Sequence, residues 1–540
     1  MPNKSFAFVR SVSPLGRELP GVWENKNGSG FRVPLNAHTV LEIPVVMPRV
    51  SADEVDRALK SELMKEDLSD FAKVHQKRML RKALALKGSH SWAPPGAGKT
   101  LVGLTFLANK PGPRLVITKA GARGTWLEQC RRYTNMEPIL LLGQKGEAPP
   151  PPEGKTPLYI TAWETLKYWA DALISMKPGA IVWDEIHWLR QPKHTKAIVQ
   201  PDGSVKFQGL GNSLDAARRI AQASGNKLGM TATPIPGRVR DLWTQLDMVE
   251  PWQWGTFHEF GMRYCQGMHN GYGYQYNGVG NEHELKERLG YIKVRIKREE
   301  VDKHLPKKRR EVVRLSHAEQ NKPAAMKREI KRAQKEGADS YFETLLMEAA
   351  SRKHGYIEDR VLEALQSQQK VVVFTGRRMD CERLANRFEK SAGKIGGCTV
   401  WWAHGGTHPG DRDKIRHEYM AHPGPALLIG TGDAWGESID LQDTDLALIT
   451  MLPWTPDKII QWEGRFARLG QKRPVLVSYI VARHTADEQV ADLLLDKLPH
   501  VGEIAEDAAA DEIEGVLSGV DESEGAAASL LARVAQLTPT

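Results

Sequence analysis

Cysteine is scarce in this sequence. The 540 residues contain four, at the irregularly spaced positions Cys130, Cys265, Cys381 and Cys398. Zinc sites need ligands at short, recurring intervals, and small disulfide-stabilised domains need far more cysteine. The scarcity therefore argues against both classes and favours a reducing compartment.

Long hydrophobic runs are missing as well. A membrane-spanning helix needs about 18 apolar residues in a row, and no stretch of the sequence approaches that length. The first residues, MPNKSFAFVRSV, lack the apolar segment of a signal peptide. No sustained internal repeat is visible. We therefore expect a cytoplasmic protein without a membrane partner.

The sequence does have an excess of basic residues. Lys and Arg number 75 against 66 Asp and Glu, so the formal net charge is +9 and the pI is near 9.1. A basic protein favours polyanionic partners, above all nucleic acid. Hydrophobic residues make up 41% of the chain, which is enough to bury sizeable cores. The length suggests roughly three or four domains of about 150 residues each.

A glycine-rich segment, SWAPPGAGKT, covers residues 91–100. Such loops point backbone N–H groups at a helix N-terminus and bind phosphate there. Lys99 adds a charge for the β- and γ-phosphates, and the Thr100 hydroxyl can ligate Mg²⁺. Ala93 replaces the usual first glycine, and a chance glycine-rich turn is the alternative interpretation. The predicted nucleotide-binding residues are Pro95, Gly96, Ala97, Gly98, Lys99 and Thr100.

Short apolar strands alternate with helical patterns along most of the chain. Strands that are apolar throughout, each followed by a helix, predict parallel sheets covered on both faces. We therefore predict an α/β fold with two parallel-sheet lobes in tandem. The expected segments are a β-rich module over 1–50, a first lobe over 51–300, a helical bridge over 301–365, a second lobe over 366–499 and a disordered acidic tail over 500–540.

Asp184 and Glu185 directly follow the apolar strand over 180–183. Parallel sheets bind ligands at the carboxyl ends of their strands. Asp184 can hold Mg²⁺ through water, and Glu185 can orient and deprotonate an attacking water. An isolated pair would be interpreted as a solvated strand end. Because a phosphate loop precedes this pair, we predict a hydrolytic, phosphoryl-transfer role for it, with Mg²⁺.

The second lobe has no phosphate loop of its own. It contains QWEGRFARLGQ over 461–471, in which Arg465 and Arg468 share one face of a predicted helix. Arginine keeps its charge, and its planar group suits phosphate oxygens. An exposed basic helix is the alternative. We favour arginine fingers that complete the first lobe's site, which accelerate hydrolysis about 10³–10⁵-fold.

Gln76 and the segment over 271–280 each have two possible interpretations. Gln76 lies one helix before the phosphate loop and could pair with an adenine edge or be an ordinary surface residue. Residues 271–280, GYGYQYNGVG, could stack bases or form a flexible surface loop. Residues 71–90, which include Gln76, are predicted to be helical.

These features together resemble helicase superfamily 2, and within it the Snf-type branch that includes chromatin remodellers. The resemblance covers residues 70–495. Its general markers are A-x-x-G-x-G-K-T, D-E-x-H at 184–187 and Thr231-Ala232-Thr233. QWEGRFARLGQ and VRIKREEVDKHLPKK match patterns of the branch, and the second match gives the basic run over 307–310 a structural interpretation in place of a nuclear signal. Asp440 and the T-A-T triplet are forms more common in other helicases.

The resemblance implies two RecA-like lobes that close on ATP and Mg²⁺ and move stepwise along DNA. It assigns adenine recognition to Gln76 and metal binding to Thr100 and Asp184. His187 would couple the ATP site to the DNA face. Catalysis is assigned to Asp184, Glu185, Gln461, Arg465 and Arg468, with Gly436 and Asp440 as further nucleotide-site residues. The residues expected to follow a DNA backbone are Thr118, Lys119, Thr161, Thr233, Thr375, His404 and Gly405.

The sequence has neither the long insertions of nucleosome remodellers nor a chromatin-reading module. We therefore expect a bacterial or phage protein of replication, recombination or repair, by analogy with annealing helicases and fork remodellers. The leading hypothesis is a DNA-stimulated ATPase that translocates on duplex DNA and remodels forks or branched junctions. A strand-separating helicase of another branch and a non-motor nucleic-acid clamp are the alternatives. The oligomeric state stays open, a monomer included.

Overall fold

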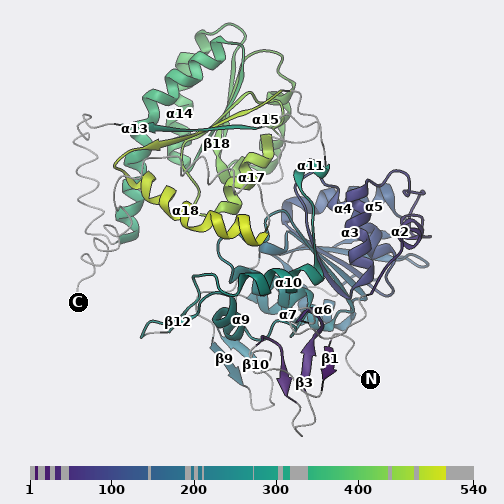
Figure 1. Cartoon of the computed structure of the whole chain (residues 1–540). Coiled ribbons are helices and arrows are strands. Elements are labelled where there is room, and N and C mark those ends of the chain that lie inside the picture. The colour runs from purple at the N-terminus through teal and green to yellow at the C-terminus, as the bar shows by residue number, and fades with distance from the viewer. Residues whose placement is uncertain are drawn as a thin grey trace. The chain divides into compact units, whose positions relative to one another are not determined.

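The structure is a computed structural model of the chain, and it describes residues 6–9, 19–24, 31–37, 48–143, 148–188, 196–199, 205–208, 212–271, 273–301, 308–316, 338–435, 441–466 and 473–505. The chain divides into two compact units, Met1–Val301 and Asp302–Thr540. Each unit is built on a parallel β-sheet (Figure 1), so the predicted α/β class with two sheet lobes is confirmed. Among the described helices, none is long and apolar enough to cross a membrane.

The first unit contains a seven-stranded sheet in which all neighbouring strands are parallel. Its central strands are buried, as their unbroken apolar sequences predicted. In spatial order the strands are β14 (Lys293–Arg295), β4 (Gly88–Trp92), β11 (Asn226–Thr231), β8 (Ala180–Asp184), β5 (Arg114–Thr118), β7 (Pro157–Ala162) and β6 (Glu137–Leu140).

Helices cover both faces of this sheet, over two separate hydrophobic cores. Successive strand residues point to opposite faces, so Val182 belongs to one core and Trp183 to the other. One face carries α2 (Ala52–Leu59), α3 (Val74–Ala85), α4 (Lys99–Ala108) and α5 (Arg123–Tyr133), and the other carries α6 (Leu166–Ser175) and α7 (Asn212–Ala223).

Strand β4 corrects the prediction of a helix over 71–90. The helix α3 ends at Ala85, and the strand Gly88–Trp92 follows. Its sequence, GSHSW, has almost no apolar character, yet all five residues are buried because β4 lies between β14 and β11. A β-carbon on Gly88 would lie 2.3 Å from the Val249 carbonyl oxygen, so the chain needs glycine there. The phosphate loop therefore follows a strand, as a nucleotide-binding loop requires.

The N-terminal residues form a small antiparallel sheet in the order β1 (Phe6–Val9), β3 (Phe31–Pro34), β2 (Trp23–Glu24). Other parts of the β-rich module predicted over 1–50, residues 38–47 among them, lie outside the described residues. Arg288, whose side chain is fully buried, fixes this segment to the rest of the first unit. Its guanidinium donates to Asn36 Oδ1 at 2.6 Å and to the carbonyl oxygens of Pro20 and Gln253 at 3.2 and 2.8 Å. The segment over 1–50 is therefore joined to the first lobe through a buried charge.

The second unit contains a six-stranded parallel sheet. The helical bridge predicted over 301–365 is wrong in part, because residues 309–315 form an edge strand of this sheet and pair with β20. In spatial order the strands are β15 (Arg309–Leu315), β20 (Leu476–Ala482), β19 (Leu446–Ile449), β16 (Lys370–Thr375), β18 (Ala426–Thr431) and β17 (Thr399–Ala403). The helices are α13 (Ala338–Gln366), α14 (Arg378–Ser391), α15 (Pro409–Ala421), α16 (Gly432–Trp435), α17 (Pro456–Phe466) and α18 (Ala486–Ala505).

The remaining elements of the first unit lie outside its central sheet. Residues 271–280, for which a flexible loop was one interpretation, contain a strand that closes a short hairpin. Figure 1 shows this hairpin projecting beyond α9. The elements are β9 (Lys196–Val199), β10 (Val205–Gln208), α8 (Asp241–Val249), α9 (Phe257–Tyr264), β12 (Met268–His269), β13 (Tyr274–Gln275), α10 (Glu282–Ile292) and α11 (Arg298–Val301).

Candidate nucleotide site and arginine helix

The glycine-rich segment forms a loop between the carboxyl end of β4 and the first turn of α4. Gly96 and Gly98 both adopt left-handed backbone conformations, with φ of +81° and +74°. Gly98 is the N-cap of α4, whose free N–H groups and dipole favour an anion at this end. The Lys99 ammonium donates to the Ala93 carbonyl oxygen at 2.8 Å, across the mouth of the loop. The backbone thus has the form of a phosphate cradle.

Asp184 lies at the end of β8 and is held in one orientation by two donors. The Thr118 hydroxyl and the Trp126 indole N–H donate to its Oδ2 at 2.8 and 2.9 Å. The Trp163 indole N–H donates to the Asp184 carbonyl oxygen at 2.9 Å. Both ends of this residue are therefore fixed by β5, α5 and the segment after β7.

Glu185 follows with a strained backbone, at φ of +49°. A non-glycine residue in this region costs about 1–3 kcal/mol, which neighbouring contacts must offset. The Glu185 carboxylate lies 3.3 Å from His187 Nδ1, and the Thr231 hydroxyl donates to it at 3.4 Å. His187 and Thr231 are themselves 2.7 Å apart. The Glu185 side chain keeps 31% exposure, so it can reach a solvent molecule.

The two carboxyl groups have opposite electrostatic environments. Burial, and then the charge of Glu185, raises the pKa of Asp184. Burial also acts to raise the pKa of Glu185, but the hydrogen bond from His187 and the charge of Lys99 outweigh it and hold that pKa below its ordinary value. Glu185 is therefore ionised at neutral pH. Strands β4 and β8 both pair in parallel with β11, so the phosphate loop and the acidic pair lie at the same edge of the sheet.

Gln76 lies against the phosphate loop. Its amide N–H donates to the Ala97 carbonyl oxygen at 3.4 Å, and its Oε1 accepts from the Lys73 backbone N–H at 2.8 Å. His75 Nε2 is 3.1 Å from the same carbonyl oxygen of Ala97. These contacts assign Gln76 a bracing role between α3 and the loop. Its pairing with adenine stays a prediction.

The three threonines of the first unit that were predicted to contact DNA are buried. Thr118, Thr161 and Thr233 are no more than 1% exposed. The Thr118 hydroxyl is bound to Asp184, and the Thr161 and Thr165 hydroxyls lie 3.4 Å apart. Lys119, directly after β5, is partly exposed. Contact of these four residues with DNA stays a prediction.

Of the residues predicted to contact DNA in the second unit, two are buried and one is exposed. Thr375 is fully buried at the end of β16, and its hydroxyl donates to main-chain oxygens. His404 is 8% exposed, and its Nε2 lies 3.4 Å from the Glu382 carboxylate. Gly405 is exposed after the end of β17. Gly436 and Asp440 lie outside the described residues.

The helix α17 contains Gln461 and Arg465, whereas Arg468 lies outside the described residues. Arg465 is 7% exposed, and its carbonyl oxygen accepts from the Leu441 N–H at 3.0 Å. Between the two lies Glu463, a residue that the sequence did not single out. It is completely buried.

Glu463 is the centre of a buried ionic cluster. Lys308 and Arg310 donate to its carboxylate at 2.5 and 2.7 Å, and the Tyr479 hydroxyl donates to it as well. Burial acts to raise the pKa of Glu463, but Lys308 and Arg310 lower it to about 2. The basic run over 307–310 is thus structural, as the resemblance implied, since two of its side chains tie strand β15 to helix α17.

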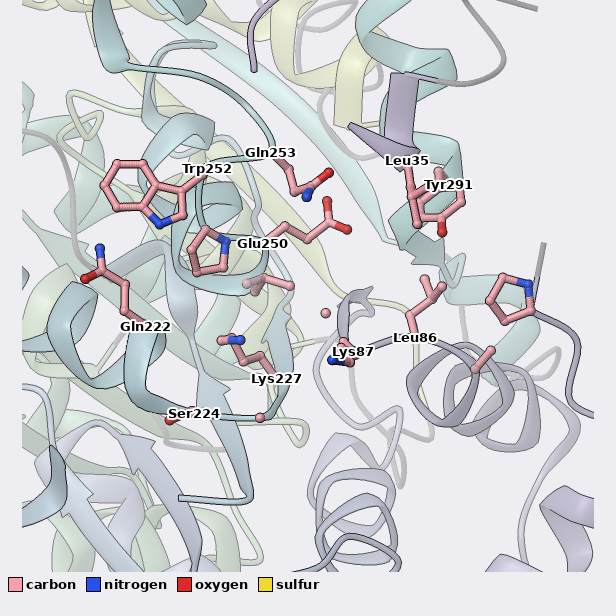
Figure 2. A pocket seen from close by; sticks show the side chains of 16 residues that line it. Leu35, Leu86, Lys87, Gln222, Ser224, Lys227, Glu250, Trp252, Gln253 and Tyr291 are labelled. Atoms are coloured by element: carbon pink, nitrogen blue, oxygen red, sulfur yellow. The ribbon is translucent and has the colours of Figure 1, made fainter. Parts of the chain in front are cut away.

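A pocket of about 600 Å³ lies at the opposite end of the first unit's sheet. Gly88 and Lys227, at the amino ends of β4 and β11, contribute to its lining. Figure 2 shows Leu35 and Tyr291 at one end of this pocket and Trp252 at the other. Parallel sheets bind nucleotides at the carboxyl ends of their strands, so this pocket is separate from the phosphate loop.

Comparisons with known proteins show which families the sequence resembles. Residues 356–470 match the family described as "Helicase conserved C-terminal domain". This range includes helix α17, which contains Arg465. The chain is 26% identical over 477 residues to "SWI/SNF-related matrix-associated actin-dependent regulator of chromatin subfamily A-like protein 1" of Xenopus tropicalis, with 85% of this chain and 46% of the relative covered. The chain is thus similar in sequence to SWI/SNF-related proteins over most of its length.

Further matches concern other SWI2/SNF2 relatives. The chain is 22% identical over 429 residues to human "DNA annealing helicase and endonuclease ZRANB3", with 75% of this chain and 38% of the relative covered. It thus spans less than half the length of these two curated relatives. The solved "Sulfolobus solfataricus SWI2/SNF2 ATPase core in complex with dsDNA" is 18% identical, with 83% of this chain and 96% of that chain covered and a TM-score of 0.37. The two curated relatives come from animals, so the bacterial or phage source stays a prediction.

Proposed function

We propose that this chain hydrolyses ATP to move along DNA and to remodel forks or branched junctions in replication, recombination or repair. The observation that supports it is that the phosphate loop after β4 and the acidic pair Asp184 and Glu185 at the end of β8 lie at the same edge of one parallel sheet, on either side of β11. The annealing-helicase name of one relative points to branched DNA as the substrate. A basic chain suits movement along a phosphate backbone without a sequence preference.

Each nucleotide-site residue of the first unit has a distinct role in this proposal. The backbone N–H groups after Gly96 hold the β-phosphate, and Lys99 offsets the charge of the transferred phosphoryl group. Glu185 orients the attacking water and accepts its proton, since its carboxylate is ionised and partly exposed. His187 and Thr231 keep that carboxylate in place.

The donor set fits the Mg²⁺ that the resemblance implies. Mg²⁺ takes one or two protein oxygens and otherwise substrate phosphates and water. Thr100 and Asp184 would hold it, and within the described residues no cluster of three or more His, Cys, Asp or Glu offers an alternative cage. Burial beside Glu185 disfavours the ionised form of Asp184, so a divalent cation would stabilise the pair. When bound, Mg²⁺ neutralises phosphate charge.

The second unit is proposed to supply Arg465 and Arg468 as positive charges for the transferred phosphoryl group. The match of residues 356–470 to the helicase C-terminal domain supports this assignment. Gln461, on the same helix, is proposed to act beside them.

The test is Glu185→Gln in the full chain. We expect nucleotide binding to persist and ATP turnover in the presence of DNA to fall by about 10²–10⁴-fold, as for loss of a general base. Binding is measured with a fluorescent ATP analogue and turnover by phosphate release. Turnover near that of the unchanged protein would refute the catalytic assignment.

A further inference from the structure

The hairpin formed by β12 and β13 exposes aromatic residues that the ATP site does not use. Its strands are antiparallel, with Met268 opposite Gln275 and His269 opposite Tyr274. Cross-strand partners point to the same face, so His269 and Tyr274 share one face and Met268 lies on the other. Tyr274 is 50% exposed and Met268 is 66% exposed.

Tyr274 is half-exposed, and a chain of rings connects it to the protein core. Its ring is nearly parallel to that of Tyr276, with centroids 6.3 Å apart and an interplanar angle of 6°, and the rings of His258 and His269 lie 4.6 and 5.1 Å from it in T-shaped contacts. Tyr276 is 8% exposed, its hydroxyl lies 2.7 Å from His258 Nδ1, and Phe257 meets it edge-on at 5.1 Å. Phe257 in turn meets the buried Trp243 at 5.5 Å. The orientation of Tyr274 is therefore set by packing before any ligand arrives.

The turn of the hairpin is also fixed. The Asn270 backbone N–H donates to the Gly273 carbonyl oxygen, and the Gly273 N–H donates to Asn270 Oδ1, both at 3.0 Å. Gly271 adopts a left-handed conformation with φ of +89°, which favours glycine. These two hydrogen bonds join Asn270 to Gly273, next to the paired residues of β12 and β13.

Positive charge lies at the base of the same hairpin. Arg238 and Arg240 donate from Nη1 to the main-chain and side-chain oxygens of Asn277, at 2.7 and 3.0 Å. Both arginines follow β11, whose last residue, Thr231, contacts Glu185 in the ATP site. A short segment of chain therefore joins the hairpin to the nucleotide site.

We propose that the hairpin over 268–275 binds unpaired bases of single-stranded DNA, with one base stacked on Tyr274 and the backbone phosphates near Arg238 and Arg240. An exposed aromatic face beside cationic side chains is the combination that single-stranded DNA needs, and stacking accepts any base. Duplex DNA keeps its bases stacked on one another, so it offers the ring no partner. This inference rests on the proposed function and adds that the first unit contacts the unpaired strand of a fork.

The experiment compares the full chain with Tyr274→Ala, Tyr274→Phe and Met268→Ala in binding to fluorescein-labelled oligothymidylate and to a labelled duplex of equal length. We expect Tyr274→Ala to weaken binding of the single strand about tenfold, as loss of one stacking ring does. Tyr274→Phe keeps the ring and should bind normally. Met268→Ala, on the opposite face, is the matched control and should also bind normally.

Unchanged single-strand affinity in Tyr274→Ala would overturn the proposal, as would an equal loss for the duplex. A loss in Tyr274→Phe equal to that in Tyr274→Ala would overturn it too, because the hydroxyl and not the ring would then bind. Failure of the proposed motor function is recognised separately, by absence of DNA-stimulated ATP turnover in the unchanged protein. These binding measurements need no ATP, so the two failures are distinguishable.

Discussion

Glu463→Gln removes one charge from a buried ionic cluster of the second unit. The carboxylate is completely buried between Lys308, Arg310 and Tyr479. The substitution keeps the shape of the side chain and removes its charge. Lys308, just before β15, and Arg310, within it, then lose the anion that compensates them. Because the cluster joins β15 to the helix that contains Arg465, both stability and catalysis should respond.

The magnitude follows from the pKa of Glu463. That pKa is about 2 in the folded chain, against an ordinary value of 4.5. At 1.36 kcal/mol per pKa unit, the ionised form adds on the order of 3 kcal/mol to the free energy of unfolding. Breaking a buried ion pair by removing one partner costs about 3–5 kcal/mol, which agrees. In a unit of this size the midpoint of thermal unfolding should fall by about 6–12 °C.

The pH dependence has a definite sign. The folded pKa of Glu463 lies below its ordinary value, so its contribution is complete above pH 4.5 and is lost as the pH falls toward 2. Thermal unfolding of the full chain and of Glu463→Gln should therefore differ most at neutral pH and converge in acid. Glu389→Gln, on the exposed side of α14, is the control and should unfold like the original protein. An equal difference at pH 7 and pH 3, or none at either, would refute the reasoning.

Four other predictions concern the ATP site and DNA binding. Arg468→Ala should lose most DNA-stimulated ATP turnover while DNA binding, measured by anisotropy, persists; equal loss of both would indicate a structural role. Trp126→Phe removes a hydrogen bond to the Asp184 carboxylate and should lower turnover, with a loss of stability of about 1.5–3 kcal/mol in chemical unfolding. Gly98→Ala would place a β-carbon 2.0 Å from Gln76 Nε2 at a left-handed position, so binding of a fluorescent ATP analogue should be abolished, and normal binding would contradict the loop geometry. DNA affinity should fall steeply as salt rises, since phosphate contacts release counterions, and a flat titration would count against backbone tracking.

The sequence predicted the parts of the fold that follow from hydrophobic patterning. Strands such as β5 and β8 contain continuous apolar runs, over 115–117 and 180–183, and a parallel sheet with two covered faces follows from them. The strand β4 could not be predicted in this way, because Ser89, His90 and Ser91 are polar and become buried only through their neighbours β14 and β11. The edge strand β15 was missed for a related reason. Its charged residues pair with Glu463, which is distant in sequence.

The candidate site was predicted through its local motifs and missed where distant residues contribute. The positions of Lys99, Asp184 and Glu185 follow from short patterns in the sequence. The donor role of Trp126 requires the packing of α5 beside β8, which no local pattern contains. The threonines at strand ends resembled DNA contacts, but a residue in the last position of a buried strand can turn its hydroxyl inward, as Thr118 does.

The most direct test of the account is ATP turnover measured in parallel without DNA and with single-stranded, duplex, forked and four-way DNA. We predict low turnover without DNA and the highest turnover with duplex-containing forks or junctions. Turnover that is the same with and without every DNA would contradict the proposal that nucleotide hydrolysis in this chain is coupled to DNA.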